Sequence, residues 1–304
     1  MDQKIIDYRA EITAQLIEAL EKGTAPWQRP WSAAYAPQNA VTGHIYKGVN
    51  AIYLAFLGFT RYDGSDPRWL TFAQAKEKGW HVRKGEKGVR VIFWGQVVKE
   101  VKDGDGKPVL DKDGKPQTTS YPVAKFYTVF HASQVEGLPE YAPELNEVPP
   151  VEVAERIISD SGAEIRHGGN QAYYNPASDE VTLPPRETFK DAASYYATAL
   201  HELGHWTGHE SRLNREMCGC KQSKVYAREE LVAELTSVFV SMETGIPQTP
   251  EHFEQHAAYV GHWAQLLRDD PDALFKAASD ASKAAEYLLK GERERAKKEE
   301  AAAA

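Results

Sequence analysis

Two histidines and a glutamate in one short segment have the residue types and spacing of a metal-dependent hydrolase. The segment reads His201-Glu202-Leu203-Gly204-His205. On an α-helix, positions i and i+4 share one face, so both imidazoles can bind one metal ion while the glutamate lies beside its water. Such ligands suit Zn2+, and Mn2+ or another divalent first-row ion can replace it. The segment therefore predicts metal-assisted hydrolysis, with Glu202 as the catalytic base.

The residues before this segment are expected to position it. Residues 191–200 contain neither Gly nor Pro and favour a helix that continues through the two histidines. Residues 179–184 have the composition of a short β-strand that ends at Pro184. Peptidases of the zincin class hold an extended substrate by backbone hydrogen bonds to such a strand, so we expect residues 179–184 to have this role.

A catalytic zinc site normally has three protein ligands, so the two histidines need a third partner. His209 does not qualify, because on a straight helix it lies about 12 Å along the axis from His201, at about 1.5 Å per residue. The longer histidine motif of the metzincins also fails, since Ser211 occupies the position of its third histidine. The third ligand is therefore expected from another element.

A second expected helix, residues 226–240, carries glutamates among apolar residues. A carboxylate that faces inward on such a helix is costly unless it is paired or bound to metal. Glu230 and Glu234 have the spacing in which the first acid binds the ion and the second orients a histidine. A one-residue shift in helix phase would instead favour Glu229, so both Glu229 and Glu230 are candidates for the third ligand.

Positive charge and aromatic side chains gather in the N-terminal part of the chain. The 304 residues include 36 basic and 44 acidic ones, but residues 22–94 hold 11 basic against 4 acidic residues. Cations neutralise phosphates and aromatic faces stack unpaired bases, so this stretch favours single-stranded nucleic acid. The candidates for these contacts lie beside Gly and Pro turns and are Trp27, Arg29, Trp31, Tyr46, Lys47, Arg83, Lys84 and Lys87. Residues 83–88 predict a β-turn that presents cations, and the alternation over 89–94 predicts that Phe93 or Trp94 points inward.

Length and patterning predict an α+β chain of two domains. The first domain, residues 1–137, is expected to combine helices and strands, and the second, residues 151–290, to be mostly helical. A linker rich in proline and glutamate, residues 138–150, separates them, and residues 291–304 form a charged tail. The elements expected in the first domain are a helix that ends at Gly23, helices near 52–59 and 72–78, and strands near 89–101 and 120–130.

Several features of the sequence are those of a cytoplasmic protein. It has no apolar run of about 18 residues and no signal-peptide core. Cys218 and Cys220 are the only cysteines, and we expect free thiols in a loop because the cytosol is reducing. The loop 102–115 is rich in Asp and Gly but lacks the bidentate glutamate of a calcium loop, so no calcium site is predicted.

Around the histidines and glutamates, the sequence resembles a known family. Residues 201–209, 211–215 and 226–234 look like the zincin-like metallopeptidase domain of ArdC-type antirestriction proteins, which conjugative plasmids carry. The N-terminal module of that family, which has relatives in plasmid primases, is similar to this chain in residues 23–31, 39–50, 69–76, 82–94 and 130–138. The resemblance departs mainly at residues 218–220 and in the charged tail.

The resemblance implies a single-stranded DNA-binding domain followed by a metallopeptidase of the glutamate-zincin type. It also implies protection of incoming plasmid DNA from host restriction, with an unidentified protein substrate such as a host restriction component. In the expected peptide hydrolysis, an ion held by His201, His205 and one glutamate activates water, and Glu202 moves the proton to the leaving amine. The candidates for stabilising the oxyanion are Tyr226, His252, His256 and His262.

Two other classes of function compete with this one. In the first, the chain only binds single-stranded DNA, and its metal site is structural or vestigial. In the second, the metal cleaves phosphodiesters, which is disfavoured because nuclease sites usually use carboxylate-rich clusters of two metals.

Residues 141–304 hold 17 basic against 28 acidic residues, so we expect DNA to stay on the first domain and to localise the peptidase rather than to activate it.

Overall fold

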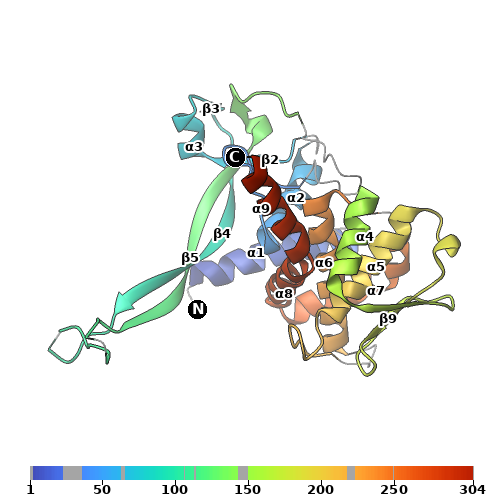
Figure 1. Cartoon of the computed structure of the whole chain (residues 1–304). Helices are drawn as coiled ribbons and strands as arrows, with labels where there is room; N and C mark the ends of the chain where they lie inside the picture. The colour runs from blue at the N-terminus through green and yellow to red at the C-terminus, as the bar shows by residue number, and fades with distance from the viewer. Residues whose placement is uncertain are drawn as a thin grey trace. The chain divides into compact units, whose positions relative to one another are not determined.

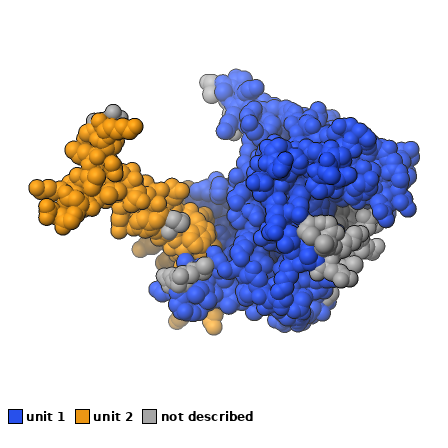
Figure 2. Space-filling model, turned by 90° about the horizontal axis from the view of Figure 1, so that it is seen from below, with its two compact units in different colours: residues 1–68, 139–304 blue, residues 69–138 orange. Residues whose placement is uncertain are grey.

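The computed structural model describes residues 3–22, 36–62, 66–105, 107–112, 114–142, 150–217, 223–248 and 250–303. The chain forms two compact units, residues 1–68 with 139–304 and residues 69–138 (Figure 2). Helices dominate the larger unit, and a long two-stranded ribbon dominates the smaller one (Figure 1). The predicted α+β class is confirmed.

The larger unit is built around one buried helix, α6. Its helices are α1 (Gln3–Glu21), α2 (Gly48–Arg61), α4 (Pro150–Ser161), α5 (Ala192–Trp206), α6 (Lys224–Thr244), α7 (Pro250–Asp269), α8 (Ala273–Leu288) and α9 (Lys290–Ala303). Helix α6 contacts α5, α7 and α8, and every residue from Glu229 to Met242 is buried. A helix that is buried all round belongs to the core. Helices α5 and α6 confirm the two helices predicted for the metal site.

The first two helices of the chain pack on its C-terminal helices. Helix α1 contacts α7, and α2 contacts α8. Arg9 on α1 donates a hydrogen bond to Asp272 at 2.6 Å, and Thr13 donates one to the carbonyl of Pro271 at 3.1 Å. The compact units therefore divide the chain differently from the predicted domains, because residues before 68 share a core with the C-terminal helices. The boundaries of the domains at 137 and 151 stay a prediction.

A small sheet lies beside the metal-site helices in the larger unit. Its strands are β7 (Glu164–His167), β8 (Tyr173–Asn175) and β9 (Glu180–Leu183), in the order β7-β9-β8. Strand β9 confirms the strand predicted before α5, but it pairs parallel with β7 and antiparallel with β8. Since both of its edges are occupied, β9 cannot take an added substrate strand, and that prediction was wrong. Among the described strands of this sheet, β7 and β8 form the edges.

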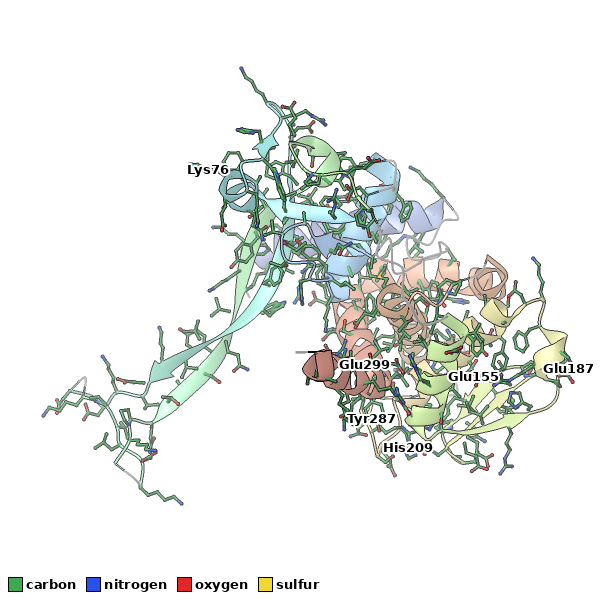
Figure 3. All side chains as sticks on the ribbon, turned by 45° about the horizontal axis from the view of Figure 1, so that its top comes forward. Lys76, Glu155, Glu187, His209, Tyr287 and Glu299 are labelled. Atoms are coloured by element: carbon green, nitrogen blue, oxygen red, sulfur yellow. The ribbon has the colours of Figure 1, made fainter. Side chains whose placement is uncertain are left out.

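Helix α4 is held against α5 by polar contacts. Glu155, labelled in Figure 3, accepts a hydrogen bond from Tyr196 Oη at 2.6 Å. Its carboxylate also pairs with Arg186 in a short 3-10 turn, Arg186–Thr188, between β9 and α5. The guanidinium of Arg186 lies over the ring of Tyr195, 4.4 Å from its centroid. These contacts fix the beginning of the helix that carries the two histidines.

The smaller unit contains three strands of a four-stranded sheet, whose order is β1-β2-β5-β4 with β1 at Gln38–Asn39, and short additions. It contains most of β2 (Arg68–Thr71), followed by α3 (Phe72–Glu77), β3 (His81–Val82), β4 (Val89–Glu100), β5 (Thr118–His131), the 3-10 turn Ala132–Gln134 and β6 (Val135–Glu136). Strand β5 pairs antiparallel with β2 and β4, and β3 pairs with β6. A Cβ on Gly88 would lie 2.6 Å from Thr128 Cγ2, so only glycine allows β4 to begin this close to β5. The strands and the helix predicted in this region are confirmed.

Strands β4 and β5 continue as a two-stranded ribbon well beyond the packed part of the unit (Figure 1). The pairing runs from Val89 opposite Val129 to Glu100 opposite Thr118. Burial along β4 ends at Ile92, after which Phe93 and Trp94 are 42% and 53% exposed. The prediction that one of these two aromatic side chains points inward was therefore wrong, because both faces of the ribbon are exposed at this point.

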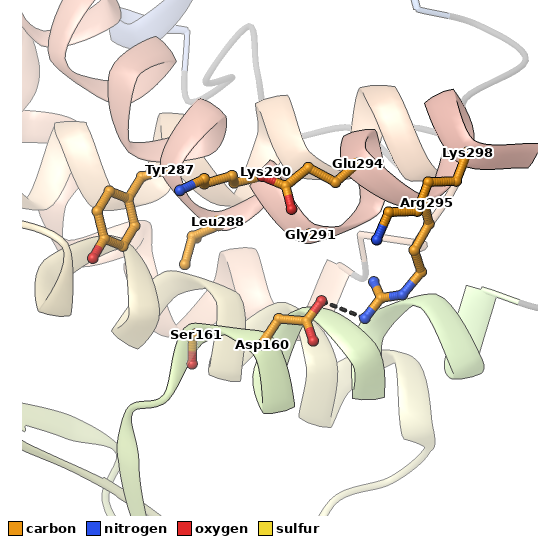
Figure 4. Close-up of a pocket in the computed structure, with 9 residues that line it drawn as sticks. All are labelled: Asp160, Ser161, Tyr287, Leu288, Lys290, Gly291, Glu294, Arg295 and Lys298. Atoms are coloured by element: carbon orange, nitrogen blue, oxygen red, sulfur yellow. Dashed lines mark hydrogen bonds and ion pairs between the residues drawn. The ribbon is translucent and has the colours of Figure 1, made fainter. Parts of the chain in front are cut away.

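The charged C-terminal residues form α9, which ion pairs hold to the larger unit. Arg295 donates a hydrogen bond to Asp160 at the end of α4 at 2.6 Å (Figure 4), and Arg293 pairs with Glu243 on α6. Gly291 permits this packing, since a Cβ there would meet the Asp160 carboxylate. Among the described residues, no helix is long and apolar enough to cross a membrane.

Candidate metal centre

Helices α5 and α6 each begin at a side-chain cap. Asp191 accepts a hydrogen bond from Ser194 N at 2.7 Å, and Ser223 accepts one from Tyr226 N at 3.0 Å. An N-cap side chain satisfies one of the backbone N–H groups that a helix start leaves without a partner. The caps fix where each helix begins and so fix which of its residues face the other helix.

Gly204, inside the histidine segment, allows the two helices to approach at backbone distance. A Cβ at this position would lie 3.0 Å from Ala233 Cα and 3.2 Å from the carbonyl oxygen of Ala233 on α6. These distances are shorter than ordinary van der Waals contact. The small residue between the two histidines therefore lets α6 bring its carboxylates within reach of the imidazoles on α5.

Three side chains from these helices converge on one point. His201 and His205 on α5 and Glu230 on α6 offer ligand atoms that all lie within 4.8 Å of one another. Nε2 of His201 is 3.6 Å from Glu230 Oε2, and Nε2 of His205 is 3.7 Å from Glu230 Oε1. Two imidazole nitrogens and a carboxylate oxygen are the donor set of a catalytic zinc site, and bonds of about 2 Å to one ion fit this spacing.

Glu229, the other candidate ligand, faces a different group. Its carboxylate accepts hydrogen bonds from Arg215 and lies 3.3 Å from Nδ1 of His205, which is the ring nitrogen away from the cluster. Among the three acidic residues of this helix segment, Glu234 has the corresponding position for the other imidazole, with Oε2 3.5 Å from His201 Nδ1. Glu229 and Glu234 can thus orient the imidazoles, while Glu230 joins them.

The cluster is electrostatically coupled. Burial opposes charge on His201, but hydrogen bonds with Glu230 and Glu234 outweigh it and raise its pKa to about 10. Burial likewise opposes charge on Glu230, yet the two imidazoles outweigh it and lower its pKa to about 2. The pKa of His205 is raised, since Glu229 and Glu230 outweigh its burial. Without an ion, His201 therefore holds a proton at neutral pH that a metal has to displace.

The general-base candidate lies next to the cluster on the same helix. Glu202 is 7% exposed and contributes to the raised pKa of His201 by its negative charge. Tyr226 donates a hydrogen bond to Glu230, which places this oxyanion candidate at the site. His262 is exposed on α7. The side chains of His252 and His256 lie outside the described residues.

Two arginines that the sequence did not single out organise the loop after α5. Arg215 bonds to Glu229, to Thr207 Oγ1 at 2.8 Å and to the carbonyl of Gly204 at 2.7 Å. Arg212 lies over the ring of Trp206, with its Cζ 3.7 Å from the centroid, and pairs with Asp179. Both arginines lie between the two metal-site helices in the sequence, and this position could have identified them. A buried arginine almost always has a charged or polar partner, and the nearest partners are those of the site.

His209 lies outside the ligand cluster, as predicted, although it follows the end of α5 at Trp206 and does not continue the helix that the distance argument assumed. Its Nδ1 is 2.8 Å from Ser211 Oγ and 4.0 Å from Asp179 Oδ2 (Figure 3). Asp179 stands at the turn between β8 and β9, in the left-handed region with φ 55°. This turn is therefore tied to the loop that follows the metal helix. Cys218 and Cys220, in the same connection, lie outside the described residues.

The predicted nucleic-acid contacts fall in both units. Trp27, Arg29 and Trp31 lie outside the described residues. In the larger unit, the Tyr46 side chain is only 6% exposed, and burial raises its pKa, so its ring is not available to stack a base. That part of the prediction was wrong. Lys47 is exposed but pairs with Glu286 at 2.8 Å.

The remaining candidates lie on the predicted turn of the smaller unit. Glu86 N bonds to the carbonyl of Arg83 at 3.3 Å, and Gly85 has φ 91°, which confirms a β-turn. Arg83 pairs with Glu86, whereas Lys84 and Lys87 are exposed. The candidates among the described residues therefore divide between Tyr46 and Lys47 in the larger unit and the turn with Arg83, Lys84 and Lys87 in the smaller one.

The helix pair and its histidine-glutamate cluster define a zincin-like domain, and comparison with known proteins agrees. Residues 152–280 match the family described as zincin-like metallopeptidase. Residues 6–130 match the N-terminal domain of anti-restriction factor ArdC. The crystal structure of the antirestriction protein ArdC from plasmid R388 is similar over 93% of this chain and 96% of that one, with 36% identity and a TM-score of 0.72. This chain belongs to the ArdC-type antirestriction family.

The chain is also similar in sequence to two primases and to an uncharacterized protein. Two DNA primases named TraC from Escherichia coli are 46% and 43% identical over 91% and 93% of this chain. The chain spans about a fifth and about a quarter of their lengths, respectively. An uncharacterized protein of Sinorhizobium fredii, y4eC, is 36% identical, with coverage of 93% of this chain and 91% of that protein.

The comparisons also bear on the metal. A second structure of R388 ArdC, equally similar in identity and TM-score, is described as Mn(II)-bound. Together with the zincin-like domain and the cluster of His201, His205 and Glu230, it supports a divalent-metal site in this chain. The expectation of a divalent first-row ion, Zn2+ or another such as Mn2+, is therefore confirmed.

Proposed function

We propose that the chain is an antirestriction protein that binds single-stranded DNA and hydrolyses peptide bonds in a metal-dependent reaction. The observation that carries the peptidase part is the convergence of His201, His205 and Glu230, with Glu202 beside them on the same helix. The family match in residues 6–130 and the positive charge of residues 22–94 support DNA binding. Protection of incoming plasmid DNA would take place in the cytoplasm.

In this proposal the residues of the site have separate tasks. A divalent ion supplies Lewis acidity and a bound water of lowered pKa. Glu202 accepts the proton of the attacking water and returns it to the leaving amine. Tyr226, through its hydrogen bond to Glu230, keeps that carboxylate in place. Glu229 and Glu234 hold the imidazoles by their Nδ1 atoms, which leaves both Nε2 atoms turned toward Glu230.

The variant Glu202→Gln tests the peptidase part, because it keeps the shape of the side chain and removes the base. We expect hydrolysis of fluorescein-labelled casein, measured with Mn2+ or Zn2+ present, to fall about 100-fold to 10,000-fold. Bound metal, measured by elemental analysis, should stay at the wild-type level. Unchanged hydrolysis in this variant would show that Glu202 is not the base.

A second candidate function is DNA binding with a structural metal site and no proteolysis. The low exposure of His201, Glu202 and Glu230, at 2%, 7% and 6%, favours this reading, because a catalytic site has to admit a substrate to the ion. Conjugation into a restricting host separates the two candidates. If Glu202→Gln protects the incoming plasmid as well as the wild type does, binding alone accounts for protection. If protection is lost with the metal retained, proteolysis is required.

A further inference from the structure

The register of β4 and β5 gathers aromatic rings and lysines on one face of the ribbon. Residues directly opposite each other, and alternate residues along each strand, share a face. Phe93 lies opposite Lys125, and Tyr127 and Tyr121 are alternate residues on either side of this lysine. Lys99 lies an even number of positions from Phe93 along β4, so it is on the same face. We call this set the ribbon face, and it consists of Phe93, Lys99, Tyr121, Lys125 and Tyr127.

The aromatic rings of the ribbon face are exposed and in contact with its other members. Phe93, Tyr121 and Tyr127 are 42%, 39% and 44% exposed. Phe93 and Tyr127 meet edge to face, with ring centroids 5.5 Å apart and planes at 87°. Lys99 Nζ lies 5.4 Å from the centroid of Tyr121. Single exposed apolar side chains are normal on a folded protein, whereas a group of neighbouring exposed rings indicates an interaction surface.

The charge of the ribbon favours an anionic partner. Strands β4 and β5 contain the cations Arg90, Lys99 and Lys125 and one acidic residue, Glu100, which lies at the end of β4 on the other face from Lys99. Two of these cations lie on the ribbon face, interleaved with its rings. Cations between aromatic faces are what proteins use to hold an unpaired nucleic-acid strand, whose phosphates need positive charge and whose bases stack on rings. A base-paired duplex offers no free base faces to such a surface.

We propose that the ribbon face binds single-stranded DNA, with bases stacked on Phe93, Tyr127 and Tyr121 and phosphates held by Lys125 and Lys99. The proposal rests on the proposed DNA-binding function and places the contacts on β4 and β5, away from the turn at residues 83–88. Stacking depends on the flat face of each ring and not on base identity, so the surface accepts any sequence.

The other face of the same ribbon supplies a matched control. Trp94 is 53% exposed and lies opposite Ala124, while Val98 lies opposite Ser120. This face therefore carries an exposed ring at the position next to Phe93 along β4, and the residue opposite it is an alanine and not a lysine. Leucine substitutions keep apolar bulk at each position and remove only the flat ring, which limits the effect on ribbon stability.

The test measures binding of the full chain to a fluorescein-labelled oligodeoxythymidylate by fluorescence anisotropy. We expect Phe93→Leu combined with Tyr127→Leu to weaken binding about 5-fold to 100-fold, and Trp94→Leu to leave it unchanged. The combined variant Lys99→Gln and Lys125→Gln should reduce the slope of log affinity against log salt by about 0.7 for each lysine. Metal content and the thermal unfolding midpoint serve as checks that each variant is folded.

The outcomes separate this inference from the function on which it rests. If the wild type does not bind the oligonucleotide, the proposed DNA-binding function fails. If the wild type binds and the ribbon-face variants bind equally well, the ribbon face is not the surface. An equal loss in Trp94→Leu would also overturn the inference. A change in sedimentation without a change in DNA affinity would mean that the face contacts protein instead.

Discussion

Arg215 holds Glu229 with two contacts in the loop that follows the metal helix. Its Nη2 lies 2.6 Å from Oε1 of Glu229, and its Nε lies 3.0 Å from Oε2. The same Oε1 is 3.3 Å from Nδ1 of His205. Both charged side chains are buried, at 6% and 8% exposure. The guanidinium therefore fixes the carboxylate that fixes the imidazole, although Arg215 lies outside the ligand cluster.

Replacement of this arginine should weaken metal binding. Lysine keeps the charge in Arg215→Lys but cannot bridge both carboxylate oxygens. We expect the affinity for Mn2+, measured by calorimetry, to fall about 10-fold to 100-fold, as is typical when a partner of a metal-bound histidine is lost. The control is Lys224→Ala at the exposed start of α6, which should bind Mn2+ as the wild type does. Equal affinity in all three proteins would leave Arg215 with a role in folding only.

The two neighbouring glutamates should respond differently to substitution. Glu230 lies between the imidazoles, so Glu230→Gln should abolish stoichiometric metal retention after dialysis. Glu229 faces Arg215 and His205 Nδ1, so Glu229→Gln should keep the ion with affinity reduced about 10-fold to 100-fold. Elemental analysis decides between them. The reverse pattern would mean that α6 turns by one residue when the ion binds.

The sequence alone could not decide between Glu229 and Glu230 as the third metal ligand, and the reason is physical. Helix α6 is buried on all sides, so its hydrophobic pattern has no polar stripe that would fix the helix phase. The histidine helix and the strands β4, β5 and β9 were predictable because their signals are local. The central position of β9 was not, because β9 pairs in parallel with β7, and β8 lies between these two strands in the sequence. The packing of α1 on α7 was equally invisible, since it joins residues far apart in sequence.

Gly204 should be sensitive to even the smallest side chain. A Cβ at 3.0 Å from Ala233 Cα requires the backbones of α5 and α6 to separate, so Gly204→Ala should lower both the unfolding midpoint and the Mn2+ affinity. Gly261 on α7 is the matched control, because a Cβ there meets nothing within 4 Å. Gly261→Ala should raise stability by about 0.5–1 kcal/mol, since alanine favours the helix. Thermal unfolding of the two variants, with and without Mn2+, measures both effects.

Metal binding should release protons at neutral pH. The pKa of His201 is raised to about 10 against burial by Glu230 and Glu234, so its imidazole is protonated at pH 7 in the metal-free protein and has to lose that proton to bind an ion. Calorimetric titration with Mn2+ in two buffers of different ionisation enthalpy should therefore give different apparent enthalpies. Equal enthalpies in the two buffers would contradict the raised pKa.

The same pKa gives the metal-free protein a characteristic stability profile. A group whose folded pKa exceeds its usual 6.5 contributes stability that is complete below 6.5 and is lost as the pH rises through about 10. Glu230, lowered from 4.5 to about 2 by the imidazoles against its burial, contributes stability above 4.5 that is lost as the pH falls toward 2. Thermal unfolding in a chelator should thus be highest between about pH 4.5 and 6.5, and His201→Asn should flatten the alkaline side.

DNA binding is expected to localise the peptidase without changing its chemistry. Residues 141–304 hold 28 acidic against 17 basic residues and repel phosphates, so the strand should stay on the basic part of the chain. A strand held there raises the local concentration of any protein bound to it, and the gain depends on the reach between the two sites. We expect Glu202→Ala to leave the affinity for single-stranded DNA unchanged. Likewise Lys84→Ala and the ribbon-face variants should leave hydrolysis of a DNA-free peptide unchanged. A large loss of peptide turnover in these folded variants would show that DNA-binding residues act on catalysis itself, against simple tethering.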